Sequence, residues 1–136
     1  MRITVLANGC WDPLHPGHIY HLRAAQAMGD RLVVSVTKNL HVNKGPERPV
    51  FDEQERMDMV RELRCVDEVL LSINALDALR KVKPDIFVKG DDYVGLIEAR
   101  DMAYCLMHGI KIAYTHERKY SSTALLHHYA AKESDA

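Results

Sequence analysis

The sequence lacks the features that mark several large classes of protein. Its apolar runs span only a few residues, far short of the roughly 18 that a membrane-spanning helix needs. Residues 1–6 have neither the length nor the cleavage site of a signal peptide. The formal net charge is -1, and there is no basic stripe or aromatic platform. We therefore expect no membrane span and no nucleic-acid partner.

Cysteine is also scarce. The three cysteines, Cys10, Cys65 and Cys105, are an odd and scattered set, which does not form a disulfide framework. They are typical of free thiols in a reducing compartment, so we expect a cytoplasmic protein. The 136 residues are 47% hydrophobic and 27% charged, as in ordinary globular proteins. With no linker or repeat, we expect one domain over residues 1–130 and a flexible tail over 131–136.

Apolar periodicity alternates between that of strands and that of helices. Asp52 and Glu55 form a capping-box pattern, and Asn74 is a helix cap. Residues 37–50 are polar and carry two prolines, which predicts a long loop. Strands are expected at residues 2–7, 32–36, 66–71, 86–88 and 110–114. Helices are expected at 17–28, from 52, from 74 to about 82, at 94–108, and from 121 or 122 to about 130.

This alternation predicts an α/β fold. Five short strands separated by helices form a Rossmann-like, doubly wound parallel sheet with helices on both faces, and we expect the strand order 3-2-1-4-5. Ligands bind such sheets beyond the carboxyl ends of the strands, where the winding reverses. That point lies between the first and fourth strands. Segments 8–18 and 89–92 should therefore hold the chemistry.

The first of these segments contains no familiar phosphate loop. Neither G-x-G-x-x-G nor G-x-x-x-x-G-K-[ST] is present. Instead, His15-Pro16-Gly17-His18 stands at the mouth of a helix, whose free N–H groups and dipole attract anions. Two histidines there predict a polyphosphate site, although they could simply cap and pack. A zinc site built from Cys10, His15, His18 and His21 is a weaker alternative. His21 comes six residues after His15, and on a helix that spacing lies well off the direction of positions i and i+3.

Five pieces of sequence, in order, resemble one known family. H-P-G-H, Lys44 in the mid-loop, the segments 48–50 and 55–56, V-K-G-D-D-Y over 88–93 and Y-S-S-T over 120–123 are similar to motifs of the H-x-G-H nucleotidylyltransferases, the cytidylyltransferase-like superfamily. The resemblance covers nearly the whole chain. It is strongest to the heptose 1-phosphate adenylyltransferase domain of ADP-heptose synthesis and to glycerol-3-phosphate cytidylyltransferase.

The resemblance implies transfer of a nucleotide from a nucleoside triphosphate, ATP or CTP, to a phosphorylated small molecule, with release of pyrophosphate. Cytidylyltransferases usually carry an R-T-x-G-[IV]-S-T-T segment. Here His116 and Lys119 stand at its arginine and glycine positions, which favours ATP. Mg²⁺ is expected between phosphate oxygens, with few protein ligands. Related enzymes are commonly homodimers, and a non-catalytic nucleotide sensor on the same fold remains an alternative.

The resemblance also assigns residues. Catalytic roles fall to His15, His18 and Lys44. Acceptor binding falls to Trp11, Asp12, Arg48 and Arg56. Nucleotide binding falls to Asn8, Gly9, Cys10, Gly17, Lys89, Gly90, Asp91, Asp92, Tyr120, Ser121, Ser122 and Thr123. Plainer roles stay open for several of these residues: packing for Trp11, a surface salt bridge for Arg56, turn formation for the aspartates, and capping for the serines.

Overall fold

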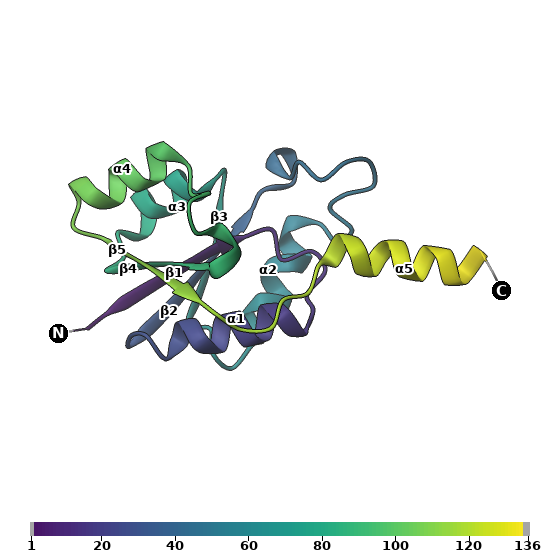
Figure 1. Cartoon of the computed structure of the whole chain (residues 1–136), viewed down its shortest axis with the longest axis horizontal. Helices are drawn as coiled ribbons and strands as arrows, with labels where there is room; N and C mark the ends of the chain where they lie inside the picture. Colours follow the sequence, from purple (N-terminus) through teal and green to yellow (C-terminus); the bar gives the residue numbers. More distant parts are fainter. Residues whose placement is uncertain (1, 135–136) are drawn as a thin grey trace.

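A computed structural model describes residues 2–134 of the chain. It contains one five-stranded parallel sheet with the order β3-β2-β1-β4-β5 (Figure 1). This confirms the predicted doubly wound architecture. The strands are β1 (Thr4–Gly9), β2 (Arg31–Thr37), β3 (Glu68–Ser72), β4 (Ile86–Gly90) and β5 (Lys111–Thr115). The helices are α1 (Pro16–Gln26), α2 (Glu53–Arg61), α3 (Ala75–Val82), α4 (Ala99–Met107) and α5 (Ser122–Ser134).

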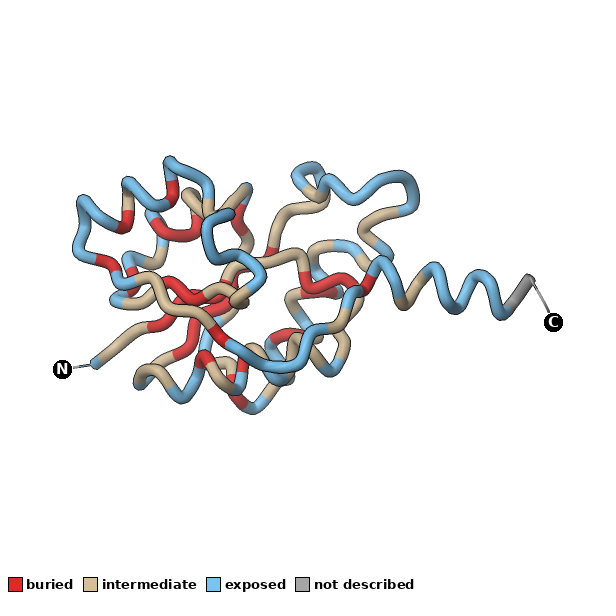
Figure 2. The backbone as a smooth tube through the Cα atoms, in the orientation of Figure 1, coloured by how far each residue is buried: buried red, intermediate tan, exposed pale blue. Residues whose placement is uncertain are grey.

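Alternate residues of the central strands build two cores on opposite faces of the sheet. Val5 and Ala7 of β1 pack with Leu22 of α1 and Val60 of α2. Leu6, the residue between them, belongs to the second core. There Phe87 packs with Leu79 of α3 and Cys105 of α4. Each face is therefore covered by two helices, and the buried residues concentrate in this layered part of the molecule (Figure 2). Within the described residues, no helix is both long and apolar enough to cross a membrane.

Two caps that the sequence predicts are present. Asp52 and Glu55 form a reciprocal capping box at the start of α2, and Asn74 accepts a hydrogen bond from the backbone N–H of Asp77 in α3. The predicted loop over 37–50 contains a short 3₁₀ turn, η1 (Asn39–His41).

The fourth helix begins later than expected. The 3₁₀ turn η2 (Asp91–Tyr93) and Gly95, with φ +76°, occupy the region where the periodicity predicted helix from residue 94. A positive φ does not continue a right-handed helix, so α4 starts only at Ala99.

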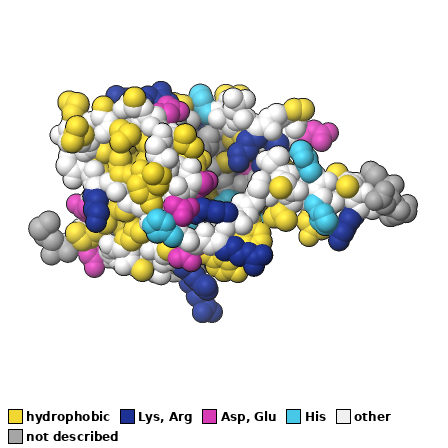
Figure 3. Space-filling model, viewed as in Figure 1, with side chains coloured by type: hydrophobic (Ala, Val, Ile, Leu, Met, Phe, Trp, Pro, Cys, Tyr) yellow, Lys and Arg dark blue, Asp and Glu magenta, His cyan; other side chains and the backbone are white. Residues whose placement is uncertain are grey.

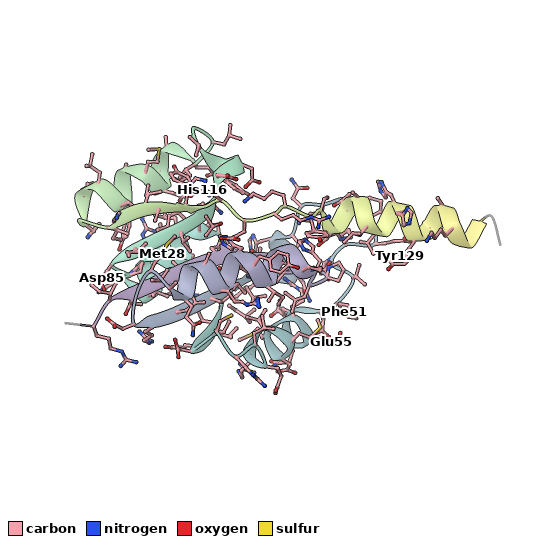
Figure 4. The ribbon with its side chains drawn as sticks, turned by 60° about the horizontal axis from the view of Figure 1, so that its bottom comes forward. Met28, Phe51, Glu55, Asp85, His116 and Tyr129 are labelled. Atoms are coloured by element: carbon pink, nitrogen blue, oxygen red, sulfur yellow. The ribbon has the colours of Figure 1, made fainter. Side chains whose placement is uncertain are left out.

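The last helix is longer than expected. It continues through residues 131–134, where the sequence predicted a flexible tail, while residues 135 and 136 lie outside the described residues. α5 extends beyond the end of the sheet, and Tyr129 on it lies far from the strands (Figure 4). Its first turn is tied to the body by two hydrogen bonds: the Ser122 hydroxyl donates to the Pro13 carbonyl at 2.9 Å, and Thr123 accepts from Arg48 at 3.0 Å.

Candidate active site

Two histidines form an unusual capping box at the start of α1. Nδ1 of His15, the N-cap residue, accepts a hydrogen bond from the backbone N–H of His18 at 3.3 Å. In return, Nδ1 of His18 accepts from the backbone N–H of His15 at 3.2 Å. The two rings stack with their centroids 3.7 Å apart. Because both Nδ1 atoms are acceptors, each neutral ring carries its proton on Nε2.

The environment keeps these rings neutral. Burial lowers the pKa of His18 to about 3, with further lowering by His15 and Lys44. Burial also lowers the pKa of His15, and Lys44 acts in the same direction. At neutral pH the pair therefore presents N–H donors rather than positive charges. These donors stand at the positive end of a helix, which suits an anionic ligand such as a phosphate.

Glycine at position 17 leaves room for the rings of His15 and Tyr120, which lie close to its Cα atom. A Cβ atom at Gly17 would meet Cε1 of His15 at 3.0 Å and Cδ2 of Tyr120 at 3.1 Å. The ring of Tyr120 lies with its centroid 5.8 Å from that of His15. Only a residue without a side chain leaves both rings in place.

A cavity of about 130 Å³, the histidine cavity, adjoins this pair. Three segments enclose it: the start of α1, the end of β4, and the connection between β5 and α5. Charged and histidine side chains gather over this connection (Figure 3). The lining residues are His15, Gly17, His21, Gly90, Asp92, Glu117, Arg118, Lys119 and Tyr120.

The connection supplies cations that the sequence analysis did not assign to the site. Nζ of Lys119 lies 3.0 Å from Asp91 and 3.9 Å from Asp92, and His116 also contacts Asp91 at 3.0 Å. These hydrogen bonds lower the pKa of the Asp91 carboxyl. The guanidinium of Arg118 lies over the ring of Tyr120 at 4.9 Å. Because Lys119 replaces the glycine of the family motif, this departure was the signal that could have identified it.

His21 is a second residue of the cavity that the sequence analysis treated only as a zinc ligand. Its Nδ1 lies 2.6 Å from the Thr115 hydroxyl, and its ring stacks on Trp11 with centroids 6.3 Å apart. Burial lowers its pKa to about 4, with Lys119 and Lys89 acting in the same direction. The i, i+3 spacing from His18 places both rings on one helix face. Among residues 2–134, no group of three His, Cys, Asp or Glu side chains is arranged to hold a metal.

Of the four residues predicted to bind the acceptor, Trp11, Asp12 and Arg56 are buried, whereas Arg48 lines a cavity. Trp11 is only 4% exposed, donates from Nε1 to the Ser35 carbonyl, and lies edge-on to His18. Arg56 is 0% exposed, and its guanidinium donates to the Phe51 and Cys10 carbonyls and to the Asn39 side chain. Both residues form the buried framework beneath the site.

Asp12 and Arg48 form the same kind of framework. The buried Asp12 carboxylate accepts from the backbone N–H groups of Val50 and Phe51 at 2.6 and 2.9 Å, and from Nε of Arg48 at 3.3 Å. Arg48 also donates to the Asp12 carbonyl and to the Thr123 hydroxyl. The pair therefore holds the end of the long loop against the segment that follows β1.

Lys44 and the start of α5 enclose a larger cavity of about 410 Å³, whose lining also includes Arg48 and Thr123. Ser121 caps α5 by accepting from the backbone N–H of Ala124 at 3.2 Å. Ser122 is buried and donates to Pro13, so it is not placed to hold a phosphate. Of the predicted Y-S-S-T segment, Tyr120 and Thr123 line cavities.

The remaining predicted residues lie at the carboxyl ends of β1 and β4. Gly9 is packed so closely that a Cβ there would lie 2.9 Å from Cε2 of Trp11. The backbone carbonyl of Cys10 accepts a hydrogen bond from the Arg56 guanidinium, and burial raises the pKa of the Cys10 thiol. Oδ1 of Asn8 accepts from the Ser35 and Ser72 hydroxyls at 2.6 and 3.2 Å.

Lys89, next to Gly90, points to the other face of the sheet. Its Nζ lies 4.1 Å from the ring centroid of Tyr93, and burial lowers its pKa. Together with Asn8, it lines a third cavity of about 290 Å³, the Asp101 cavity, which lies on the side of α3 and α4. Its lining also includes Thr37, Tyr93, Leu96, Glu98, Arg100 and Asp101.

The fold and the paired histidines define a class of protein that binds a phosphorylated ligand where the winding of a doubly wound sheet reverses. Residues 6–127 match the family model described as Cytidylyltransferase-like, and the chain belongs to this family. It is thus a nucleotidyltransferase domain.

The similar proteins come from several organisms. The chain is 44% identical over 94 residues to the bifunctional protein HldE of Azorhizobium caulinodans and 47% identical over 94 residues to that of Gluconobacter oxydans. Each match covers 66% of this chain and 20% of the relative, so the chain spans about a fifth of these curated proteins. A lipopolysaccharide core biosynthesis protein from Thermoplasma volcanium is 31% identical with a TM-score of 0.71. That match covers 89% of this chain and 100% of the other.

Proposed function

We propose that the chain transfers a nucleotide from a nucleoside triphosphate, ATP in preference to CTP, to a sugar phosphate and releases pyrophosphate. The observation that carries the proposal is the reciprocal capping box, which holds the Nε2–H donors of His15 and His18 at the start of α1. Such fixed donors, available without reorganisation, are what stabilise the charge of a phosphoryl-transfer transition state.

In this mechanism an oxygen of the acceptor phosphate attacks the α-phosphorus, and the bond to the bridging oxygen of pyrophosphate breaks. No side chain needs to form a covalent intermediate. The two histidines donate to phosphate oxygens as negative charge shifts toward the leaving group. Lys44 and Lys119 supply positive charge from the two segments on either side of α1. Each fixed donor is worth roughly 10²–10³ in rate.

The preference for ATP rests on the connection between β5 and α5. The arginine that cytidylyltransferases usually carry is replaced by His116, which contacts Asp91. Lys119, at the glycine position, also contacts Asp91. The segment is thus built around an ion pair rather than around a glycine turn. CTP with glycerol 3-phosphate or a similar alcohol phosphate is the second candidate.

Mg²⁺ is part of the proposal, and the residues present fit a metal held mainly by the substrate. Mg²⁺ commonly binds to nucleotide-dependent enzymes through the substrate phosphates and one or two carboxylates. Asp92, which lines the histidine cavity, is the carboxylate that would assist. The ion would neutralise charge on the triphosphate.

A sugar phosphate is favoured as acceptor by the similarity to the Thermoplasma volcanium protein. That protein's name refers to the lipopolysaccharide core, a structure assembled from sugars.

We also propose the homodimer that the resemblance implies. Light scattering coupled to size-exclusion chromatography tests it, and a monomeric mass at working concentration would refute it.

The experiment that tests the function measures pyrophosphate release. ATP and CTP are each offered with heptose 1-phosphates, glycerol 3-phosphate, ethanolamine phosphate and FMN, with His15→Asn as the blank. We expect release with ATP and a sugar phosphate. Release with CTP and glycerol 3-phosphate supports the second candidate. Nucleotide binding without release for any pair supports a nucleotide sensor.

A further inference from the structure

A carboxylate oxygen without a hydrogen-bond partner in the described part of the chain is buried in the Asp101 cavity. Asp101 lies in the first turn of α4 and is only 5% exposed. Within residues 2–134 its Oδ1 has no hydrogen-bond partner. Nε of Arg100 approaches to 4.0 Å but is engaged with Glu98 at 2.9 Å. Buried polar atoms are nearly always hydrogen-bonded in native proteins, and an exception calls for an explanation such as a missing ligand.

The cavity around this carboxylate has the character of a small-molecule site. Its volume of about 290 Å³ lies near the lower end of the range for ligand pockets, roughly 300–1,000 Å³. Tyr93 and Leu96 give it apolar walls, while Lys89 and Arg100 add two cations. Burial raises the pKa of the Asp101 carboxyl, and Lys89 opposes that shift.

The position of the cavity relates it to the reaction. Gly90 lines the histidine cavity, and Lys89, its neighbour in β4, lines the Asp101 cavity. The two spaces therefore lie on opposite faces of the sheet, and both reach the end of β4, where the winding reverses. A molecule in the Asp101 cavity could place one end at the phosphates bound beside the histidines.

We infer that the Asp101 cavity binds the hydroxyl-bearing part of a polyhydroxylated acceptor phosphate, with Asp101 as the residue that selects it. Hydroxyl groups donate to the unpaired carboxylate and accept from Lys89, and the C–H faces of a polyol suit the apolar walls. Lys89 acts on the same carboxylate, so hydroxyl groups, which can donate to Asp101 and accept from Lys89, suit this pair better than an ammonium group, which can only donate. This inference rests on the proposed function, and it assigns the acceptor to residues other than the four that the resemblance implied, Trp11, Asp12, Arg48 and Arg56.

The test compares Asp101→Asn with Glu98→Gln, which removes the same charge from an exposed neighbour in the same cavity. Calorimetric titrations use aldose 1-phosphates, glycerol 3-phosphate, ethanolamine phosphate and inorganic phosphate as probes. We expect at least one polyol phosphate to bind Asp101→Asn at least tenfold more weakly than the wild type. Inorganic phosphate should bind both alike, and Glu98→Gln should stay within twofold of the wild type.

Stability separates recognition from a structural role. Because burial disfavours the charged form of Asp101, Asp101→Asn should leave the thermal midpoint unchanged or higher. Loss of a residue that supports the fold would lower the midpoint. The inference is overturned if Asp101→Asn binds polyol phosphates as the wild type does. It is also overturned if the wild type binds ethanolamine phosphate more tightly than every polyol phosphate. A third contrary outcome is that no polyol phosphate binds at a ligand concentration of about 10 mM, which exceeds the millimolar dissociation constants of weak complexes.

The proposed function fails by a different result. Pyrophosphate release is followed in parallel, with His15→Asn as the variant that should lose release while keeping polyol phosphate binding. Binding through Asp101 without release from any nucleotide would reject the transferase and keep the site. Release that is indifferent to Asp101→Asn would keep the transferase and reject the site.

Discussion

Replacing His15 by asparagine separates the two roles that the structure gives this residue. Its Nδ1 accepts the backbone N–H of His18, and its Nε2–H is the donor proposed for a phosphate oxygen. The amide oxygen of asparagine can take the place of Nδ1, and asparagine is among the best N-cap residues. It has no donor at the position of Nε2. We therefore expect His15→Asn to fold normally and to lose about 10²–10³ in the rate of pyrophosphate release.

Alanine at the same position removes both roles. Loss of an N-cap acceptor costs about 1 kcal/mol. In a chain of this size that lowers the thermal midpoint by roughly 3–5 °C. His15→Ala should therefore match His15→Asn in rate but melt earlier. The comparison needs only a coupled pyrophosphate assay at saturating substrates and a thermal scan of each variant.

The same logic applies at the other half of the capping box. Glutamine is a usual partner at the N3 position, so His18→Gln should still accept the backbone N–H of His15. It should lose catalysis as His15→Asn does. If either variant keeps its rate of pyrophosphate release within threefold of the wild type, the Nε2 donors do not stabilise the transition state, and the catalytic role proposed for the histidine pair is wrong.

Three further perturbations follow from the geometry. Gly17→Ala should lower the rate at least tenfold with little change in fold, because the new methyl group displaces the His15 ring; unchanged steady-state kinetics would contradict this. Burial lowers the pKa of His18 to about 3 and of His21 to about 4, whereas unfolded histidines titrate near 6.5. The unfolded chain then binds more protons in acid, so stability is full above pH 6.5 and falls by up to about 1.4 kcal/mol per histidine for each pH unit toward 4. Urea unfolding at pH 7 and pH 5 measures this loss, and equal stabilities would count against buried neutral rings. Asp12→Ala leaves two backbone N–H groups and a guanidinium without their acceptor and should lower the free energy of unfolding in urea by about 3–5 kcal/mol. A loss under 1 kcal/mol would show that Asp12 does not hold the loop in place.

Local patterns in the sequence were enough to predict the fold and to point to the start of α1 as the candidate site. Alternating apolar periodicity predicted the five strands, and the right-handed crossover rule left few orders for them. The caps at Asp52 and Asn74 are local signals, since a cap depends on residues three positions apart. The H-P-G-H segment likewise marked the start of α1, because its pattern lies within a single turn of helix.

The roles of the other site residues depend on contacts that form only in the folded chain. Trp11, Asp12 and Arg56 lie near the site in sequence, but contacts with distant segments bury them and occupy their polar groups. Periodicity cannot show this, because it records which face a residue occupies and not which partner meets it there. Asp101 was missed for the same reason. Its importance lies in a buried oxygen atom without a hydrogen-bond partner among the described residues, and burial of that atom is visible only in the folded chain.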